Sequence, residues 1–374
     1  GRGGADARAR DALADGRREG ARRLPRGARL LVAFALASLV VAAAFMLARR
    51  ARTVGADKPK PQPPAAENGG AWQPRMTLET GSRVYSVAFS PDERLLAAAS
   101  SEPLREDAQF VSEVRLWDAA TGELKRVLTE HSEGVLSVSF SPDGGALACG
   151  TGSGSGESKL GKVKLWDART GELKWAVSGH KDFVTSVAFS PDGRVVASGS
   201  LDGTIKLWEA RGGALIRTLP ANEGVYATAF SPDGRLLASA GRDSVRLWDA
   251  EGGEVARSLS GNEYAVRSLS FSPDGRTLAG GDIGGAVELW DVASGALVRA
   301  FGDHGDVVDC VAFAPGGSAL ASGGYDSTVV LRDLQSASVI ATLRAGDKVT
   351  SVAFSRDGRT LAAGGWGKAV QLWK

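Results

Sequence analysis

The chain has 374 residues, with 45 Lys and Arg against 43 Asp and Glu, which is enough for one large domain or several small ones. Residues 1–71 carry 14 cationic and 6 acidic side chains, whereas the rest is mildly acidic, with 31 and 37. An acidic body is poorly suited to a phosphate backbone, and two cysteines and three scattered histidines form no metal-binding spacing. We therefore predict a protein without a nucleic-acid partner, a cofactor or a metal.

A long apolar segment lies near the beginning of the chain. Residues 30–48 contain no charged side chain, and arginines flank them on both sides. As a helix, this segment would be about 28 Å long, close to the ~30 Å hydrocarbon core of a bilayer. It predicts a transmembrane helix, preceded by a basic juxtamembrane segment at residues 1–29. A cleavable signal peptide ending near Ala42–Ala44 is the alternative.

The charges beside this segment predict its orientation. Nine arginines precede it, and five Lys and Arg lie between it and residue 60. Because the more basic flank stays on the cytoplasmic side, we predict a single-pass membrane protein with an extracytoplasmic C-terminal body. Residues 49–74 are predicted to form a linker, because four prolines between Pro59 and Pro64 hold the backbone extended.

Residues 75–374 consist of one unit that is repeated seven times. The phrase V-x-S-V-A-F-S-P-D-G recurs with its phenylalanine at positions 89, 140, 189, 230, 271, 313 and 354. A second phrase, x-L-W-D, recurs in step with it, with the Trp position at Trp117, Trp166, Trp208, Trp248, Trp290, Arg332 and Trp373. Self-similarity at a fixed period indicates a repeat architecture.

Each unit predicts four short strands, as the third unit shows. Val184–Phe189 alternates apolar and polar residues, and the turn Ser190–Gly193 joins it to Val195–Ser198. Two further strands are expected at Thr204–Trp208 and Ala214–Leu219. A four-stranded unit of about 41 residues is typical of a propeller blade. The predicted fold class is therefore all-β, a seven-bladed β-propeller of four-stranded antiparallel blades.

The third unit resembles the repeats of the WD-repeat family through residues in a fixed order, which are Gly179, His180, the turn Ser190–Gly193, Ser198, Asp202, Leu207 and Trp208. The resemblance extends over about residues 75–374 and implies a closed ring. Leu78 lies as far before Phe89 as Leu343 lies before Phe354. We therefore expect Arg75–Glu79 to supply the missing fourth strand of the seventh blade.

His180, Ser198 and Asp202 allow two interpretations. They have the residue types of nucleophilic catalysis, with serine attacking and histidine as the base. The family resemblance instead implies a buried structural tetrad with Trp208, held by hydrogen bonds.

Other units contain this set only in part. The corresponding residues are His304, Ser322 and Asp326 in the sixth unit, Ser239, Asp243 and Trp248 with Asn222 nearby in the fourth, His131, Cys149 and Trp166 in the second, and Gly284 and Gly367 at the Asp position of the fifth and seventh. Because catalysis would concentrate in one place, we predict scaffold residues and no catalytic site.

Two units are lengthened by insertions near Ser101–Ser112 and Thr151–Lys162. The second insertion is rich in Gly and Ser but lacks the spacing of a phosphate-binding loop. In a propeller, both insertions would share one face with Tyr325 and Trp366, which precede the Asp position of the sixth and seventh units. Aromatic side chains commonly anchor interfaces. We predict a partner-binding arc that includes Tyr325, Trp366 and Phe110.

The sequence as a whole indicates a membrane-anchored scaffold for a protein or peptide partner, not an enzyme. Its Arg- and Ala-rich flanks and uniform repeats resemble bacterial proteins in which a signalling domain, such as a Ser/Thr kinase, precedes the membrane helix. A chain that begins with Gly1 fits a piece of such a protein. The alternative is a propeller hydrolase, lactonase- or peptidase-like, that uses the central channel. A supporting role within a larger complex is a third interpretation.

Overall fold

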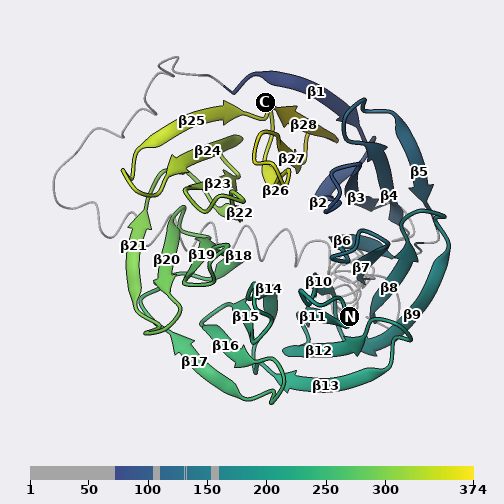
Figure 1. The fold of residues 1–374 in the computed structure, drawn as a ribbon, viewed down its shortest axis with the longest axis horizontal. Helices are drawn as coiled ribbons and strands as arrows, with labels where there is room; N and C mark the ends of the chain where they lie inside the picture. The colour runs from purple at the N-terminus through teal and green to yellow at the C-terminus, as the bar shows by residue number, and fades with distance from the viewer. Residues whose placement is uncertain (1–71, 104–109, 130, 132, 153–159) are drawn as a thin grey trace, which may run out of the picture. The chain divides into compact units, whose positions relative to one another are not determined.

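A computed structural model describes residues 72–103, 110–129, 131, 133–152 and 160–374. These residues form 28 strands in seven four-stranded antiparallel sheets, the blades of a β-propeller (Figure 1). The predicted all-β, seven-bladed fold is therefore confirmed. Within the described ranges, no helix has the length and hydrophobicity needed to cross a bilayer. The predicted segments 1–29 and 30–48, and nearly all of the predicted linker 49–74, lie outside those ranges.

The blades are numbered along the chain. Blade 1 contains β2 (Arg83–Phe89), β3 (Leu95–Pro103), β4 (Phe110–Asp118) and β5 (Leu124–Leu128). Blade 2 contains β6 (Gly134–Phe140), β7 (Ala146–Gly152), β8 (Gly161–Asp167) and β9 (Leu173–His180). Blade 3 contains β10 (Val184–Phe189), β11 (Val195–Ser200), β12 (Thr204–Glu209) and β13 (Leu215–Pro220). Blade 4 contains β14 (Val225–Phe230), β15 (Leu236–Gly241), β16 (Val245–Asp249) and β17 (Val255–Leu259).

The remaining strands belong to three blades. Blade 5 contains β18 (Val266–Phe271), β19 (Thr277–Asp282), β20 (Val287–Asp291) and β21 (Leu297–Phe301). Blade 6 contains β22 (Val308–Phe313), β23 (Ala319–Gly324), β24 (Thr328–Asp333) and β25 (Val339–Arg344). Blade 7 contains β26 (Val349–Phe354), β27 (Leu361–Gly365), β28 (Ala369–Trp373) and β1 (Pro74–Glu79).

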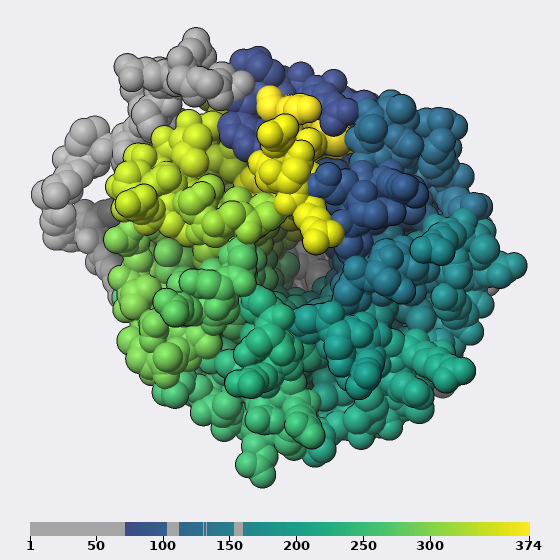
Figure 2. All heavy atoms as spheres, viewed as in Figure 1, coloured from purple at the N-terminus to yellow at the C-terminus, as the bar shows by residue number. Residues whose placement is uncertain are grey.

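Every blade is a meander that runs outward from the centre of the ring. Its first strand lies innermost and its fourth strand lies at the rim (Figure 1), and the space-filling view is hollowed at the centre (Figure 2). Strand direction alternates, so the turn after the second strand shares a face with the loop that enters the first. In blade 3 these two segments are joined by a hydrogen bond of 3.0 Å from Leu201 N–H to the carbonyl of Phe183. We call this the upper face, and the Ser-Pro-Asp-Gly turns lie on the lower face.

The lower turns are built by their own side chains. In blade 3 the Ser190 hydroxyl donates to Asp192 (2.6 Å) and accepts the N–H of Val195 (3.0 Å). Gly193 has a φ of 73°, a left-handed conformation that favours glycine. The recurring turn sequence therefore fixes a tight connection between the first two strands.

Apolar side chains are buried between blades. Val163 and Leu165 of blade 2 pack in one cluster with Val184, Val187 and Trp208 of blade 3. Seven such clusters are found, and each joins two neighbouring blades, including blades 7 and 1. A single four-stranded sheet cannot cover both of its own faces, so each blade depends on the next.

The ring is closed by the first strand of the body. β1 pairs antiparallel with β28, and Leu78 lies opposite Val370. Leu78 is buried and packs against residues of blade 1 as well as blade 7. The predicted closure is confirmed, and it begins slightly early, because Gln73, assigned to the linker, exchanges two backbone hydrogen bonds with Lys374.

The first insertion differs from its expected loop structure. Residues near Ser101–Ser112 extend β3 and β4, so that Ser101 pairs with Ser112 and Pro103 pairs with Phe110. The strands continue because pairing satisfies backbone groups that a loop would leave to water. Residues 104–109 and 153–159, at the tips of the two insertions, are outside the described chain.

Replacing Leu78 with alanine tests the closure. The variant is expected to lose about 2–4 kcal/mol of the free energy of unfolding, because the side chain is buried between the first and last blades. Urea denaturation of the full chain measures this loss, with Thr77→Ala on the exposed side of β1 as the matched control. Deletion of residues 72–80 should lower the melting temperature further. Equal stability of Leu78→Ala and Thr77→Ala would contradict closure by β1.

Candidate partner-binding site

Blade 3 forms a complete hydrogen-bonded tetrad with His180, the last residue of β9 in blade 2. Ser198 Oγ accepts the indole N–H of Trp208 (2.7 Å) and lies 2.8 Å from Nε2 of His180. Nδ1 of His180 lies 3.0 Å from Asp202, whose carboxylate also accepts the hydroxyl of Thr204 (2.6 Å). These hydrogen bonds lower the pKa of Asp202, although burial alone would raise it. Ser198 and His180 are 0% and 1% exposed, so a substrate cannot approach this serine.

Blade 6 repeats three members of the tetrad. His304 Nε2 lies 2.8 Å from Ser322 Oγ, and Nδ1 lies 3.1 Å from Asp326. Burial would raise the pKa of Asp326, but the hydrogen bonds from His304 and Thr328 lower it to about 2. Arg332 occupies the Trp position of this blade. Its Nε donates a hydrogen bond to the carboxylate of Asp303 (2.9 Å) instead of to the hydroxyl of Ser322.

In blade 4 the structure separates Asp243 from the other two predicted residues. Trp248 donates to Ser239 (2.8 Å), as in blade 3. Asp243 is exposed, and its N–H donates to the Glu223 carboxylate (2.7 Å), which also accepts the Ser244 hydroxyl. The reason is that the turn between β15 and β16 is one residue shorter than in blade 3. The carboxylate that accepts hydrogen bonds in this turn is therefore that of Glu223, and the prediction that Asp243 is the acid of the tetrad is wrong.

Blade 2 has His and Trp at the tetrad positions without the bridging hydroxyl. Cys149 occupies the serine position, and His131 and Trp166 lie with ring centroids 5.2 Å apart. Among the described residues, neither His131 nitrogen nor Trp166 Nε1 has a hydrogen-bond partner, although all three atoms are buried. Burial, assisted by the charge of Lys164, lowers the pKa of His131 to about 3. The imidazole is therefore neutral and leaves its donor unsatisfied.

Blades 5 and 7 carry Gly284 and Gly367 at the position of the acid, as the sequence indicates. In blade 5 the Trp290 indole donates to the carbonyl of Ser260 (3.1 Å) instead of a serine hydroxyl. Burial, together with Asp282, raises the pKa of Glu288 in this blade to about 7. The tetrads are thus structural elements with buried Ser, His and Trp positions, and their completeness varies around the ring.

Tyr325 and Trp366 lie side by side on the upper face. Their ring centroids are 6.0 Å apart, and both side chains are half-buried. The N–H of Tyr325 donates to Val307 (2.9 Å), and that of Trp366 donates to Lys348 (3.0 Å), as Leu201 does in blade 3. These hydrogen bonds fix both turns against the loops that enter β22 and β26. The predicted pair of aromatic residues therefore forms one surface across blades 6 and 7.

Two cations complete this surface. Lys348 Nζ lies 4.5 Å from the ring centroid of Tyr325 and 4.4 Å from that of Trp366. Arg83 Cζ, in blade 1, lies 4.3 Å from the Trp366 ring. We call Tyr325, Lys348, Trp366 and Arg83 the upper stack. In the upper stack, Tyr325 of blade 6 lies against Lys348 of blade 7. In the same way, Trp366 of blade 7 lies against Arg83 of blade 1.

The positions of Lys348 and Arg83 are equivalent in their blades. Each directly precedes the first buried valine of the innermost strand. The other blades have small or apolar residues there, namely Gly134, Phe183, Gly224, Ala265 and Val307. The two cations were not predicted from the sequence, although this single position differs in charge from its equivalents in the other five units.

An ion pair lies beside the stack, toward the centre of the ring. Arg267 Nε lies 3.0 Å from Asp309, and its Cζ lies 4.9 Å from the Tyr226 ring centroid. Arg267 and Asp309 occupy bulges in β18 and β22, where an extra residue re-aims its side chain. Burial and the charge of Asp309 raise the pKa of Tyr325, so its hydroxyl remains protonated.

The first insertion reaches the same surface. Glu102 of β3 forms an ion pair of 3.1 Å with Lys368, two residues after Trp366. Phe110 begins β4, but its side chain is outside the described structure. The backbone of this hairpin is therefore linked to the turn of blade 7 that carries Trp366.

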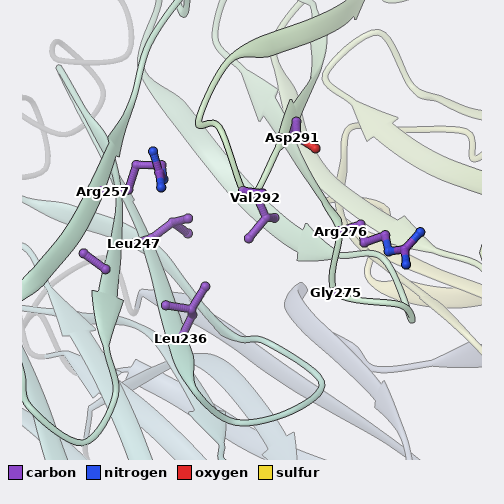
Figure 3. Close-up of a pocket in the computed structure, with 9 residues that line it drawn as sticks. Leu236, Leu247, Arg257, Gly275, Arg276, Asp291 and Val292 are labelled. Carbon is purple, nitrogen blue, oxygen red and sulfur yellow. The ribbon is translucent and has the colours of Figure 1, made fainter.

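A depression of about 470 Å³ lies between blades 4 and 5, near the lower face (Figure 3). It opens beside Ala256, where neighbouring blades have the larger Ile216 and Val298. Arg257 in its wall donates to the carbonyl of Ser294 (3.2 Å) in the next blade. The guanidinium thus holds two blades together, and we do not assign a ligand to this depression.

Replacing Cys149 with serine tests the structural role of the tetrad. The variant is expected to be more stable by about 1 kcal/mol, because the hydroxyl would satisfy both Trp166 Nε1 and His131. Urea denaturation measures the change in the free energy of unfolding. Cys310→Ser is the matched control, because Cys310 is also buried but its sulfur already contacts the Gly323 carbonyl (3.6 Å). A loss of stability in Cys149→Ser as large as in the control would contradict this role.

Comparison with known protein families supports the repeat assignment. The family model of the WD domain, G-beta repeat, matches seven segments, which are residues 72–102, 122–167, 171–209, 213–249, 253–291, 295–333 and 337–374. No curated protein matches the chain significantly. The matched segment 171–209 contains β9 of blade 2 and β10–β12 of blade 3, so each repeat contributes to two blades. Because these segments cover most of the sequence, the chain belongs to the WD40 family.

Proposed function

We propose that this chain is a membrane-anchored WD-repeat scaffold that binds a protein or peptide partner on the upper face of its propeller. WD40 propellers commonly bind protein partners, and the fold fits an interaction scaffold. The observation that carries the proposal is the upper stack. Two aromatic rings and two cations lie together on three adjacent blades, and backbone hydrogen bonds hold the turns that carry the aromatic rings in place.

The physical character of this surface supports a binding role. Aromatic and arginine side chains account for much of the energy of protein interfaces, because they bury a large area with few rotatable bonds. The stack lies on a ring whose blades share their cores, so little ordering is needed when a partner binds. The alternative of nucleophilic catalysis has less support, because the Ser198 and Ser322 side chains are buried.

The membrane context rests on the sequence. The apolar residues 30–48 would anchor the chain, the proline-containing linker would hold the propeller away from the bilayer, and the excess of N-terminal arginine would place the propeller outside. The propeller would then be the sensing or interaction part of a bacterial signalling protein.

Substitution of Trp366 tests the binding site. Partners that co-purify with the full chain from native membranes should be recovered at least tenfold less with Trp366→Ala, since loss of a central aromatic commonly costs about 2 kcal/mol. Ile216→Ala is the control, because Ile216 is exposed on the rim strand β13. Recovery that falls equally in both variants, or in neither, would exclude the upper stack as the site.

Protease protection tests the orientation. In sealed vesicles of known sidedness that contain the full chain, the C-terminal propeller should be digested only when the extracytoplasmic side is accessible. Digestion from the cytoplasmic side would reverse the proposed orientation, and an intracellular assembly platform would replace the sensor.

A further inference from the structure

The two cations of the upper stack lack an anionic partner in the described structure. Neither Lys348 nor Arg83 forms an ion pair with a carboxylate of the described chain, whereas nearby Lys368 and Arg267 do. Of two nearby carboxylates, Asp309 pairs with Arg267, and Asp347 accepts the backbone N–H of Lys348 (2.7 Å) but forms no ion pair with the Lys348 ammonium in the described structure.

The aromatic rings give these cations a fixed place. A cation over an aromatic face is held by about 0.5–2 kcal/mol, depending on its exposure to water. Since Trp366 contacts both Lys348 and Arg83, the two positive charges lie on the same ring system. Partial burial beside the rings strengthens the attraction of both charges for an anion.

From this arrangement we infer that the upper stack binds the carboxylate of an acidic side chain, presented by an extended segment of a partner protein. This inference rests on the proposed function and names the chemistry of the partner. A carboxylate accepts hydrogen bonds from an ammonium and a guanidinium at once, and such charge-assisted bonds are about twice as strong as neutral ones. The methylene groups of a Glu side chain would contact the Trp366 ring.

The exposure of the upper stack favours a peptide side chain over a small molecule, because its four side chains are only half-buried. The cavity of about 30 Å³ that Lys348 lines together with Gly365 and Gln371 includes none of the other three stack residues, and it has about the space of one water molecule. A small ligand normally buries most of its surface in a pocket roughly tenfold larger. A peptide needs no such enclosure, because its neighbouring residues make contacts along the face.

The charge of the surroundings opposes a nucleic-acid ligand. The body of the protein carries 31 Lys and Arg against 37 Asp and Glu after residue 71. Glu102 of β3 and Asp306 and Asp347, on the loops that enter β22 and β26, also lie around the stack. A single carboxylate brings one negative charge to Lys348 and Arg83, whereas a chain of phosphates would bring several close to these acids.

The test uses octapeptide arrays that are randomised except for a central Glu, Gln or phosphoserine, probed with the full chain in nanodiscs. Peptides with central Glu should be enriched, and the best of them is then measured by fluorescence anisotropy. Binding should weaken about tenfold in Lys348→Gln and in Arg83→Gln. Arg242→Gln is the matched control, because Arg242 is an exposed arginine on the upper face of blade 4. The affinity of this variant for the Glu peptide should differ from the wild-type affinity by less than twofold.

Each other outcome overturns the inference. If the Gln peptides bind as tightly as the Glu peptides, the ligand needs no carboxylate. A strong preference for phosphoserine would assign the site to a phosphorylated partner. Binding of an eight-nucleotide oligothymidine as tightly as the Glu peptide would assign it to nucleic acid. Melting temperatures equal to the wild type establish that the variants are folded.

The two proposals fail separately. If native partners are lost in Trp366→Ala but retained in Lys348→Gln and Arg83→Gln, the upper stack is a partner site and the acidic side chain is wrong. If native partners are retained in all three variants, both proposals are wrong.

Discussion

Each four-stranded sheet of this protein has two apolar faces, and only the neighbouring sheets bury them. The seven apolar clusters follow from this constraint, since every cluster takes residues from two blades. A linear array would leave two faces exposed, so the apolar surface requires a ring. The pairing of β1 with β28 joins the ends of the ring, and the stiffness of every surface turn depends on it.

The tetrads add local rigidity to a ring that is held mainly by packing. Blade 3 keeps all four residues, whereas blade 2 loses the bridging hydroxyl and blade 4 obtains its acid from Glu223. Because the apolar clusters remain in every blade, a single missing hydrogen bond does not open the sheet. The ring thus tolerates variation at these positions, and such tolerance fits structural residues better than catalytic ones.

The repeat pattern predicted the parts of the structure that depend on periodicity. Phe and Trp recur in step, so the blade number and the four strands could be expected from spacing, and the family resemblance together with the position of Leu78 indicated the closing strand Arg75–Glu79. Asp243 was assigned to the tetrad because of its residue type. The assignment was wrong, because the turn that contains Asp243 is one residue shorter than the equivalent turn of blade 3, and this changes the positions of its side chains. The shorter turn was visible in the sequence, since Phe230 lies 18 residues before Trp248 whereas Phe189 lies 19 residues before Trp208, but strand register was needed to place the missing residue in this turn.

The partner-binding surface was predicted only in part, because some of its residues come together only through contacts between adjacent blades. Tyr325 and Trp366 stood out as large aromatic residues at one repeat position, and the structure places them together. Lys348 and Arg83 were not noticed, because a surface cation is ordinary in composition and becomes informative only beside a ring of the adjacent blade. The Arg267–Asp309 pair was hidden likewise, since it forms between bulges in strands of two different blades.

The closing strand also sets the order of events during synthesis. β1 leaves the ribosome before every other strand of the propeller, yet its partner β28 is the last strand made. At 5–20 residues per second, the roughly 290 residues between Leu78 and Val370 take about 15–60 s to translate. During that time the earlier blades can fold against one another, while β1 remains without its strand partner. The ring can therefore close only after translation has reached its final blade, and a chain interrupted before β28 keeps an open sheet edge that invites aggregation.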